Sequence, residues 1–324
     1  MSVLAYTENW DGKFKKSTFE LLSYANEIAK KAGTELIALT IGQVAEDELK
    51  LLGNYGATKV FVVENEKLND FIAKSYSSAI SQVAQSQGAK FVIFANNVSG
   101  RALSARTAVK LNAGFVPGVM QLPSSIEPFV VRKKAYSGKA FADFELNSDV
   151  KVLSLTQNSF KIIEDTKEIV IEKSSVDIKD TDLGAKPKSV EKTTGKLLIT
   201  EAETLVSAGR GLKGPENWTM VEEMAEILGA AICCSRPVAD LEWRPHEEHV
   251  GQTGKVVAPN LYIAIGISGA IQHLAGVNGS KVMVAINTDP EAPFFEAADY
   301  GIIGDAFKVV PLLNEALKKF KAGQ

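Results

Sequence analysis

The sequence predicts a two-domain α/β protein in which each domain is built on a mainly parallel sheet flanked by helices. A chain of 324 residues is too long for a single ordinary hydrophobic core, so two domains are expected. Short apolar runs alternate with segments whose apolar residues recur at helical spacing, a pattern typical of parallel sheets covered on both faces. A charge-rich, turn-rich stretch at residues 169–190 interrupts the alternation, so the domains are expected to span residues 1–190 and 191–324.

Strands and helices alternate through the first part of the N-terminal domain. The expected strands are residues 3–6, 35–41, 59–63 and 91–95. One helix is expected at residues 19–32, where Gly33 follows two lysines as a stop signal, and another at residues 69–87. This order predicts parallel strands joined by helical crossovers.

From about residue 129 the pattern changes to short alternating strands separated by polar turns. The expected strands are residues 130–131, 139–146 and 150–155. We predict that they form a meander at the edge of the first sheet. Earlier in the domain, residues 99–101 (Ser-Gly-Arg) resemble a phosphate-binding turn, but a purely structural turn is the favoured interpretation.

A second α/β unit follows the charge-rich stretch. The expected strands are residues 196–200, 230–234, 261–265, 281–286 and 301–304. The expected helices are residues 218–229, a helix beginning at residue 271, and residues 309–320. Strands separated by helices in this way predict a doubly wound parallel sheet.

Composition excludes several classes of function. The formal net charge is -3 and no block of basic residues is present, which argues against binding to nucleic acid. Cys233 and Cys234 are adjacent and cannot build a disulfide framework, and the three histidines lack the spacing of a zinc site. No apolar stretch approaches the ~20 residues that cross a bilayer, and no targeting segment is recognisable. We therefore expect a cytoplasmic protein without a transmembrane segment or a metal.

Four loops of the second domain lie where strands end, which is where open α/β sheets bind ligands. In the first, residues 207–212, two glycines flank Arg210, whose planar fork of donors suits a diphosphate; an ordinary turn is favoured for this pattern alone. In the second, residues 233–237, the cysteines are expected to be small core residues. Ser235 and Arg236 are better site candidates, although a surface ion pair explains Arg236 equally well.

The third loop, residues 250–255, contains glycines that let the backbone approach a ligand closely. Gln252 and Thr253 within it both donate and accept hydrogen bonds, but a plain hairpin turn would look similar.

The fourth loop joins the strand at residues 261–265 to the helix that begins at residue 271. Its glycines place unpaired backbone N–H groups at a helix N-terminus, where a pyrophosphate binds. Ser268 adds a hydroxyl donor, and His273 is expected to face the ligand. The spacing differs from the Gly-x-Gly-x-x-Gly of NAD-binding turns, so a Rossmann dehydrogenase is not supported.

These loops together resemble the signature of electron-transfer flavoprotein α subunits. The matching segments, in the family's order and spacing, are residues 209–213, 235–236, 250–255, 261–264, 266–273, 276, 284–287 and 299–301. The resemblance is dense from about residue 197 to residue 317 and mainly topological before that. Residues 241–244 (Leu-Glu-Trp-Arg) and 156–160 depart from the family pattern.

The resemblance implies that the C-terminal domain binds FAD. Arg210 and residues 268–270 would lie on the phosphate side, Arg236 over the flavin ring, Thr253 near N5, and His273 near the N1/O2 edge. The full set of residues implied to contact FAD is Arg210, Ser235, Arg236, Val250, Gly251, Gln252, Thr253, Ser268, Gly269, Ala270, Ile271, Gln272, His273, Asn287, Asp305 and Ala306.

The resemblance also implies a heterodimer with an electron-transfer flavoprotein β subunit, which would contribute AMP. The N-terminal domain would be a scaffold that docks this subunit. The pair would be a redox carrier rather than a catalytic enzyme, taking electrons from flavin dehydrogenases such as acyl-CoA dehydrogenases to a membrane quinone reductase or another acceptor. Three alternatives stay open: an NAD-dependent Rossmann oxidoreductase, a nucleotide-binding module without flavin, and the α subunit of an electron-bifurcating flavoprotein.

Overall fold

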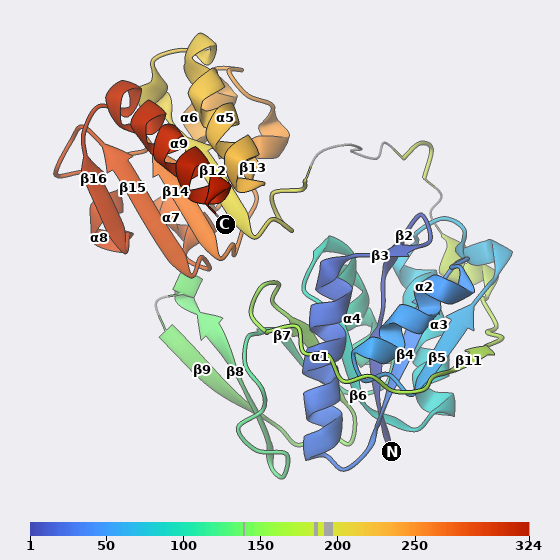
Figure 1. Cartoon of the computed structure of the whole chain (residues 1–324). Helices are drawn as coiled ribbons and strands as arrows, with labels where there is room; N and C mark the ends of the chain where they lie inside the picture. Colours follow the sequence, from blue (N-terminus) through green and yellow to red (C-terminus); the bar gives the residue numbers. More distant parts are fainter. Residues whose placement is uncertain (139, 185–186, 191–196, 324) are drawn as a thin grey trace. The chain divides into compact units, whose positions relative to one another are not determined.

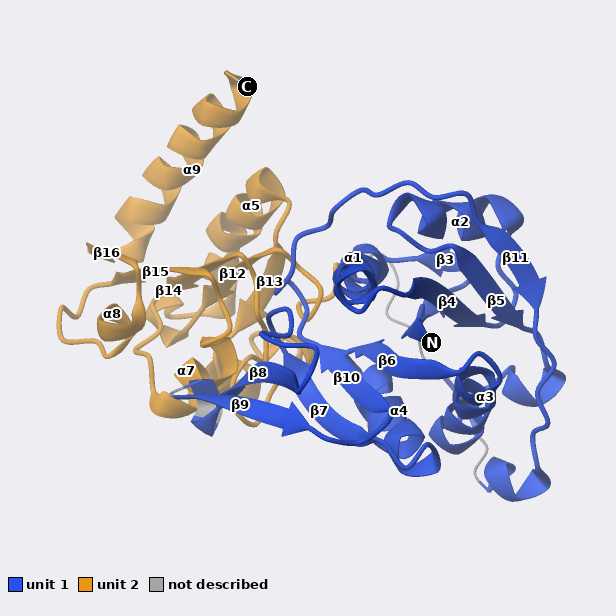
Figure 2. Cartoon of the chain, turned by 90° about the horizontal axis from the view of Figure 1, so that it is seen from below, with its two compact units in different colours: residues 1–191 blue, residues 192–324 orange. Residues whose placement is uncertain are grey.

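The computed structural model describes residues 1–138, 140–184, 187–190 and 197–323. The chain forms two compact units, Met1–Glu191 and Lys192–Gln324 (Figure 2). Both are α/β units with a mainly parallel sheet between helices, so the predicted fold class is confirmed. Among the described residues, no helix combines the length and apolar character that crossing a bilayer requires.

The first unit contains a large mixed sheet with the strand order β11-β5-β4-β1-β6-β10-β7-β8-β9 (Figure 1). Its strands are β1 (Ser2–Tyr6), β4 (Glu35–Ile41), β5 (Lys59–Val63), β6 (Ala89–Ala95), β7 (Gly114–Val119), β8 (Phe129–Ala135), β9 (Ala140–Leu146), β10 (Lys151–Leu155) and β11 (Val170–Lys173). Pairing is parallel from β11 to β7 and antiparallel from β7 to β9. A separate two-stranded ribbon joins β2 (Asn9–Trp10) to β3 (Lys13–Phe14).

Helices cover both faces of this sheet because its central strand is apolar on both sides. The helices are α1 (Lys16–Lys31), α2 (Glu46–Lys50), α3 (Ala73–Ser86) and α4 (Val98–Lys110). Val3 and Ala5 of β1 pack in one cluster with α1, whereas Leu4 packs in a second cluster with α3 and α4. The alternation follows from the two-residue period of a strand.

One prediction for this unit is wrong. Residues 150–155 are not part of an edge meander, since β10 lies between β6 and β7 and pairs with both in parallel. Val152 and Leu153 are both fully buried, so the strand faces helices on both sides rather than solvent on one. The edge consists of β8 and β9 alone, and residue 139, the expected start of the second strand, lies outside the described residues.

The elements α4, β7 and β11 were not anticipated. Residues 99–101 lie in the first turn of α4, where the Asn97 side chain accepts a hydrogen bond from the Gly100 N–H at 2.7 Å. A methyl group at Gly100 would lie 1.8 Å from the Ala95 carbonyl oxygen, so this glycine serves close packing. β7 was not expected because glycines and Pro117 interrupt its apolar pattern, and β11 lies inside the charge-rich, turn-rich stretch at residues 169–190.

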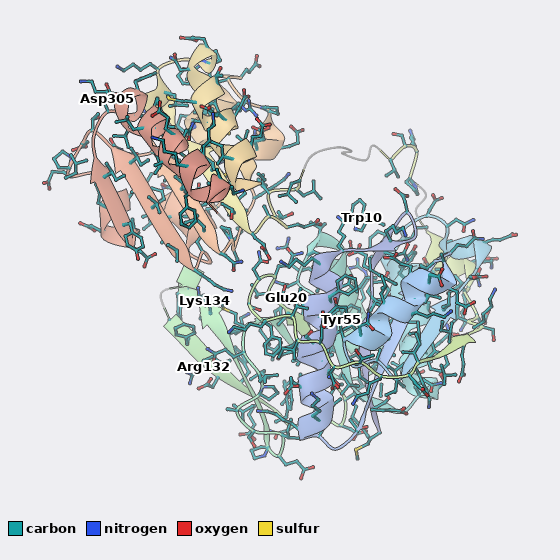
Figure 3. All side chains as sticks on the ribbon, in the orientation of Figure 1. Trp10, Glu20, Tyr55, Arg132, Lys134 and Asp305 are labelled. Atoms are coloured by element: carbon teal, nitrogen blue, oxygen red, sulfur yellow. The ribbon has the colours of Figure 1, made fainter. Side chains whose placement is uncertain are left out.

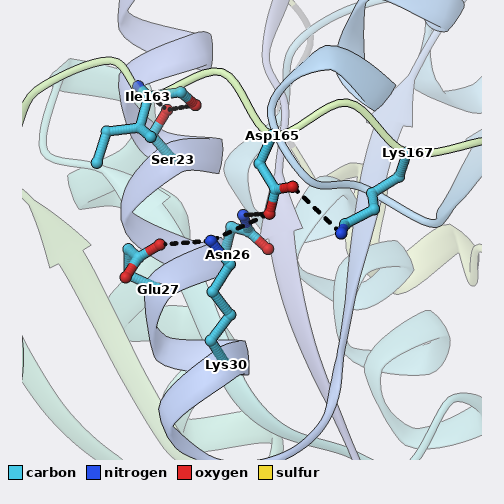
Figure 4. A network of polar contacts seen from close by, with 7 residues as sticks. All are labelled: Ser23, Asn26, Glu27, Lys30, Ile163, Asp165 and Lys167. Atoms are coloured by element: carbon cyan, nitrogen blue, oxygen red, sulfur yellow. Dashed lines mark hydrogen bonds and ion pairs between the residues drawn. The ribbon is translucent and has the colours of Figure 1, made fainter.

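The segment between β10 and β11 is fixed to α1 by partly buried polar contacts (Figure 4). The Asp165 carboxylate accepts a hydrogen bond from Asn26 at 2.9 Å and pairs with Lys30 and Lys167 at 3.0 and 3.2 Å. These three partners hold the pKa of Asp165 well below its usual range. Glu20, labelled in Figure 3, fixes the same segment by accepting backbone hydrogen bonds from residues 158–160.

The second unit contains a fully parallel sheet with the order β13-β12-β14-β15-β16. Its strands are β12 (Thr204–Ala208), β13 (Ala231–Cys234), β14 (Leu261–Ile265), β15 (Val282–Asn287) and β16 (Tyr300–Ile303). Its helices are α5 (Thr219–Leu228), α6 (Arg236–Asp240), α7 (Ile271–Val277), α8 (Phe294–Ala297) and α9 (Ala306–Ala322). α5, α6 and α9 pack on one face of the sheet, and α7 and α8 on the other, which confirms the doubly wound arrangement.

The strand predicted at residues 196–200 is wrong. Residue 196 lies outside the described residues, and residues 197–200 form no strand. The first strand is β12, which pairs with both β13 and β14 and therefore lies inside the sheet. A strand was expected because residues 197–199 form an apolar run. In the structure Ile199 lies in a turn, from which its buried side chain packs against the core.

Candidate functional site

The strand order of the second unit creates a topological switch point. β12 and β14 are neighbours in the sheet, but β13 lies between them in the sequence. The chain leaves β12 towards the face covered by α5 and leaves β14 towards the face covered by α7. Open α/β sheets bind ligands in the crevice at the carboxyl ends of two such strands.

The loops that follow β12 and β14 cross each other in direct backbone contact. The Gly209 N–H donates to the Ile265 carbonyl at 2.9 Å, and the Gly211 N–H donates to the Gly266 carbonyl at 3.1 Å. A methyl group at Gly209 would lie 2.3 Å from the Gly266 carbonyl oxygen, and Gly266 has a φ of 61°. Glycine is therefore required on both sides of the crossing, and Arg210 projects from it into solvent.

Backbone contacts bring the other two loops to the same place. The Ser235 N–H donates to the Ala208 carbonyl at 3.2 Å, so the end of β13 adjoins the end of β12. The Gln252 N–H donates to the Gln272 carbonyl at 2.7 Å, which fixes the third loop to α7. A methyl group at Gly276 would lie 2.5 Å from the α-carbon of Gly251, so this contact also requires glycine.

Asn287, Asp305 and Ala306, which the resemblance implies contact the adenosine side of FAD, lie at or after the ends of β15 and β16. The Asn287 side chain donates to the Ile267 carbonyl at 3.1 Å and thereby ties the end of β15 to the loop after β14. Asp305, labelled in Figure 3, caps α9 by accepting a hydrogen bond from the Phe307 N–H at 3.1 Å. All the predicted site residues thus lie along one edge of one sheet, although their contacts with a cofactor stay a prediction.

Side-chain exposure divides these residues into two groups. The exposed residues are Arg210, Arg236, Gln252, Thr253, Ser268, Ala270, Ile271 and Gln272. The buried ones are Ser235, Val250, Gly251, Gly269, His273 and Ala306, with Asn287 and Asp305 intermediate. The exposed group contains most of the hydrogen-bond donors, and the buried group shapes the loops that carry them.

Arg236 makes the surface ion pair that the sequence left open. Its Nε lies 3.3 Å from the Asp240 carboxylate, one helical turn further along α6. Both side chains are more than half exposed, at 65% and 56%, and such pairs are weak. The ion pair therefore does not prevent the guanidinium from serving a bound anion.

His273 is held inside the unit by a residue that sequence reasoning missed. Its Nε2 lies 2.9 Å from the hydroxyl of Tyr262 on β14, and both side chains are buried. Burial, followed by the nearby His249, lowers the pKa of His273 to about 4, so its imidazole is neutral at pH 7. The signal in the sequence was a tyrosine within an apolar strand, because a buried phenol hydroxyl needs a polar partner.

A second missed feature fixes the segment that departs from the family pattern. Arg244, only 15% exposed, contacts Glu248 through two nitrogens at 2.7 and 3.0 Å and Glu222 of α5 at 2.7 Å. Its guanidinium also lies 5.0 Å from the centre of the Trp218 ring. The four-residue spacing of Arg244 and Glu248 was only a weak signal, because the two residues do not share an α-helix. The network fastens residues 241–249 to α5.

The two cysteines are confirmed as core residues. Both are free and buried, and burial raises the pKa of each thiol to about 12. They are therefore protonated at neutral pH and poor nucleophiles.

The chemistry of the donor set fits FAD. The exposed guanidinium of Arg210 and the hydroxyl of Ser268 suit a diphosphate. Ala270, the N-cap residue of α7, provides no side-chain cap for the first N–H groups of the helix. Gln252 and Thr253 offer exposed groups that both donate and accept, as the polar edge of an isoalloxazine ring requires. The glycine crossing leaves the backbone open to close approach.

Comparisons with known proteins agree with these features. The family model of the electron transfer flavoprotein FAD-binding domain matches residues 198–278, and that of the electron transfer flavoprotein domain matches residues 3–180. A relative from Syntrophomonas wolfei named electron transfer flavoprotein subunit alpha is 38% identical over 315 residues, covering 97% of this chain and 98% of the relative.

Two further relatives span the chain. One from Bacillus subtilis with the same name is 37% identical over 318 residues, covering 98% of this chain and 97% of the relative. One from Anaerotignum propionicum, named acryloyl-CoA reductase electron transfer subunit beta, is 30% identical over 352 residues, covering 98% of this chain and 96% of the relative. The chain belongs to the electron transfer flavoprotein α-subunit family, whose FAD-binding domain corresponds to its second unit.

Proposed function

We propose that this chain holds FAD at the carboxyl edge of β12–β16 and carries electrons between protein partners as one subunit of a heterodimer. The observation that carries this proposal is the convergence of exposed donors from four loops on the switch point between β12 and β14. The family membership supports the same cofactor. The contact residues are those predicted from the sequence.

Each group has a distinct task in this proposal. FAD supplies a ring that accepts and releases one or two electrons. Arg210, Ser268 and the uncapped N–H groups at the start of α7 bind the diphosphate. Arg236 stabilises negative charge on the ring electrostatically, and the Thr253 hydroxyl hydrogen-bonds at N5. His273, neutral at pH 7, contributes a hydrogen bond rather than a charge.

The first unit serves as the scaffold that docks an electron transfer flavoprotein β subunit, which contributes AMP. The electron donors are flavin dehydrogenases such as acyl-CoA dehydrogenases, and the acceptor is a quinone reductase or a comparable protein. The Anaerotignum propionicum relative, named as an electron transfer subunit of an acryloyl-CoA reductase, supports a partner that acts on acyl-CoA compounds. We place the heterodimer in the cytoplasm.

Co-expression with the β subunit from the same organism tests the proposal. The purified heterodimer should be yellow, and extraction should yield one FAD and one AMP. Two FAD molecules would favour the electron-bifurcating alternative, and a colourless heterodimer would refute flavin binding.

Substitution of Arg236 tests the assignment of the ring environment. The Arg236→Ala heterodimer should retain FAD but show a lower flavin potential, because a positive charge near the reduced ring is lost. Arg106→Ala, which removes an exposed arginine of α4 in the other unit, is the matched control and should leave the potential unchanged. Equal potentials for wild type and Arg236→Ala would contradict the role given to Arg236.

A further inference from the structure

His249 lies directly beneath the loop assigned to the flavin and has a polar atom that the fold does not use. The side chain is 2% exposed, and within the described part of the chain its Nδ1 has no hydrogen-bond partner. A buried polar atom without a partner is destabilising, so its presence calls for an explanation. No step of the proposed function employs this imidazole.

The backbone fixes His249 against both ends of the flavin loop. Its carbonyl accepts a hydrogen bond from the Lys255 N–H at 2.9 Å, and its own N–H donates to the His246 carbonyl at 3.1 Å. A methyl group at Gly254 would lie 2.8 Å from Nδ1, and one at Gly251 would lie 3.4 Å from Nε2. Both ring nitrogens therefore adjoin the glycines that flank Gln252 and Thr253.

The charged and titratable groups around His249 come from three helical elements. His246, in the short 3-10 helix η7 (His246–Glu248), has its ring centre 5.5 Å from that of His249. Asp240 and Arg236 of α6 act on His249 with opposite signs, and His273 of α7 interacts with it through charge. Burial, the largest influence, lowers the pKa of His249 and keeps the ring neutral.

A neutral imidazole in this position responds to the charge above it. Negative charge brought onto the ligand would favour the imidazolium form, since opposite charges attract strongly where water is excluded. Among the described residues, His273 is the other histidine whose Nδ1 lacks a hydrogen-bond partner, and its Nε2 is already bonded to the Tyr262 hydroxyl.

We propose that His249 is a redox-linked protonation site, taking up a proton from solvent when the adjacent flavin site gains an electron. This inference rests on the proposed function. The electron comes from the donor dehydrogenase and the proton from water. When the flavin is reoxidised, the electron passes to the acceptor and the proton returns to solvent. The net charge of the buried region stays constant through the cycle, which lowers the electrostatic cost of holding an electron there.

The pH dependence of the flavin potential in the FAD-loaded heterodimer tests this proposal. Wild type, His249→Gln and His246→Gln are compared by potentiometric titration at several pH values. The wild-type slope should exceed that of His249→Gln by up to about one proton per electron over the range in which His249 titrates. His246→Gln removes an exposed histidine of the same segment and should keep the wild-type slope.

A second readout does not depend on the His249 variant being folded. The heterodimer is labelled at histidine Cε1, and its NMR spectra are recorded oxidised and reduced over the same pH range, with signals assigned from His246→Gln and His273→Gln. The His249 signal should titrate at higher pH in the reduced protein. Identical titration in both states, together with equal slopes in the potentiometric experiment, overturns the proposal. Absence of flavin from the wild type would instead refute the proposed function.

Discussion

Mild acid should weaken the second unit through His273. The buried imidazole has a pKa of about 4, against 6.5 for an unburied histidine, so between these values the unfolded chain binds a proton that the folded unit does not. The free energy of unfolding therefore falls as the pH falls through that window. At 1.36 kcal/mol for each pKa unit, the full loss is roughly 3 kcal/mol, and about 2 kcal/mol of it should appear by pH 5.

The perturbation that isolates this effect is His273→Gln, which keeps a polar side chain opposite Tyr262 but removes the titration. Amide hydrogen exchange of peptides from β14 and β15 reports the stability of this unit without interference from the other. Wild type and variant are compared at the same pH, so that the intrinsic pH dependence of exchange cancels. Between pH 7 and pH 5 the wild type should lose about 2 kcal/mol more protection than His273→Gln.

His246→Gln is the control because His246 is exposed, and it should lose as much protection as the wild type. If His273→Gln also loses as much as the wild type, the imidazole is not the group whose protonation opposes folding. The reasoning from its burial would then be wrong.

Three further substitutions test other contacts. Tyr262→Phe leaves Nε2 of His273 without its partner and should cost about 1–3 kcal/mol in urea unfolding, whereas Tyr300→Phe, at a residue 67% exposed, should cost almost nothing. Asp165→Asn should cost about 1–2 kcal/mol of unfolding free energy at pH 7. It should also remove the loss of stability that the wild type shows as pH falls below about 4, because a carboxyl with a lowered pKa gives its full stabilisation only above the pKa it has in the unfolded chain. Asp47→Asn is the control, since the Asp47 side chain is 99% exposed. Gly266→Ala places a methyl group 2.8 Å from the α-carbon of Gly211 and should lower both stability and FAD retention. Gly229→Ala is the control: Gly229 has a similar φ of 64°, but its added methyl group would have no atom within 4 Å, so only the cost of the left-handed backbone should appear.

The sequence predicted elements well where the local pattern was sufficient. The ranges of β4, β5 and β14 match the expected strands because each is an apolar run between turn residues. β10 has the same kind of run but was placed at the sheet edge, since its neighbours β6 and β7 are distant in the sequence. A strand's partners are set by the whole chain, so local periodicity indicates that a strand exists and not where it lies.

The candidate site divides in the same way. Its glycines could be recognised from the sequence, because a close backbone approach requires them wherever it occurs. The hydrogen bond between Tyr262 and His273 and the contact of Arg244 with Glu222 join residues from different elements, so no spacing in the sequence indicates them. The neutral state of His273 likewise follows from its burial and not from its residue type.

The glycine crossing explains why the donors of this site are exposed without being loosely placed. The loops after β12 and β14 are joined by the hydrogen bonds Gly209–Ile265 and Gly211–Gly266, and the third loop is joined to α7 by Gln252–Gln272. These bonds fix the backbone through the chain's own contacts before any ligand contributes. Cofactor binding then needs to order only side chains such as Arg210 and Arg236, which costs about 0.5–1.5 kcal/mol for each one immobilised. A replacement that breaks a loop-to-loop bond should therefore weaken FAD binding more than the removal of one exposed donor does.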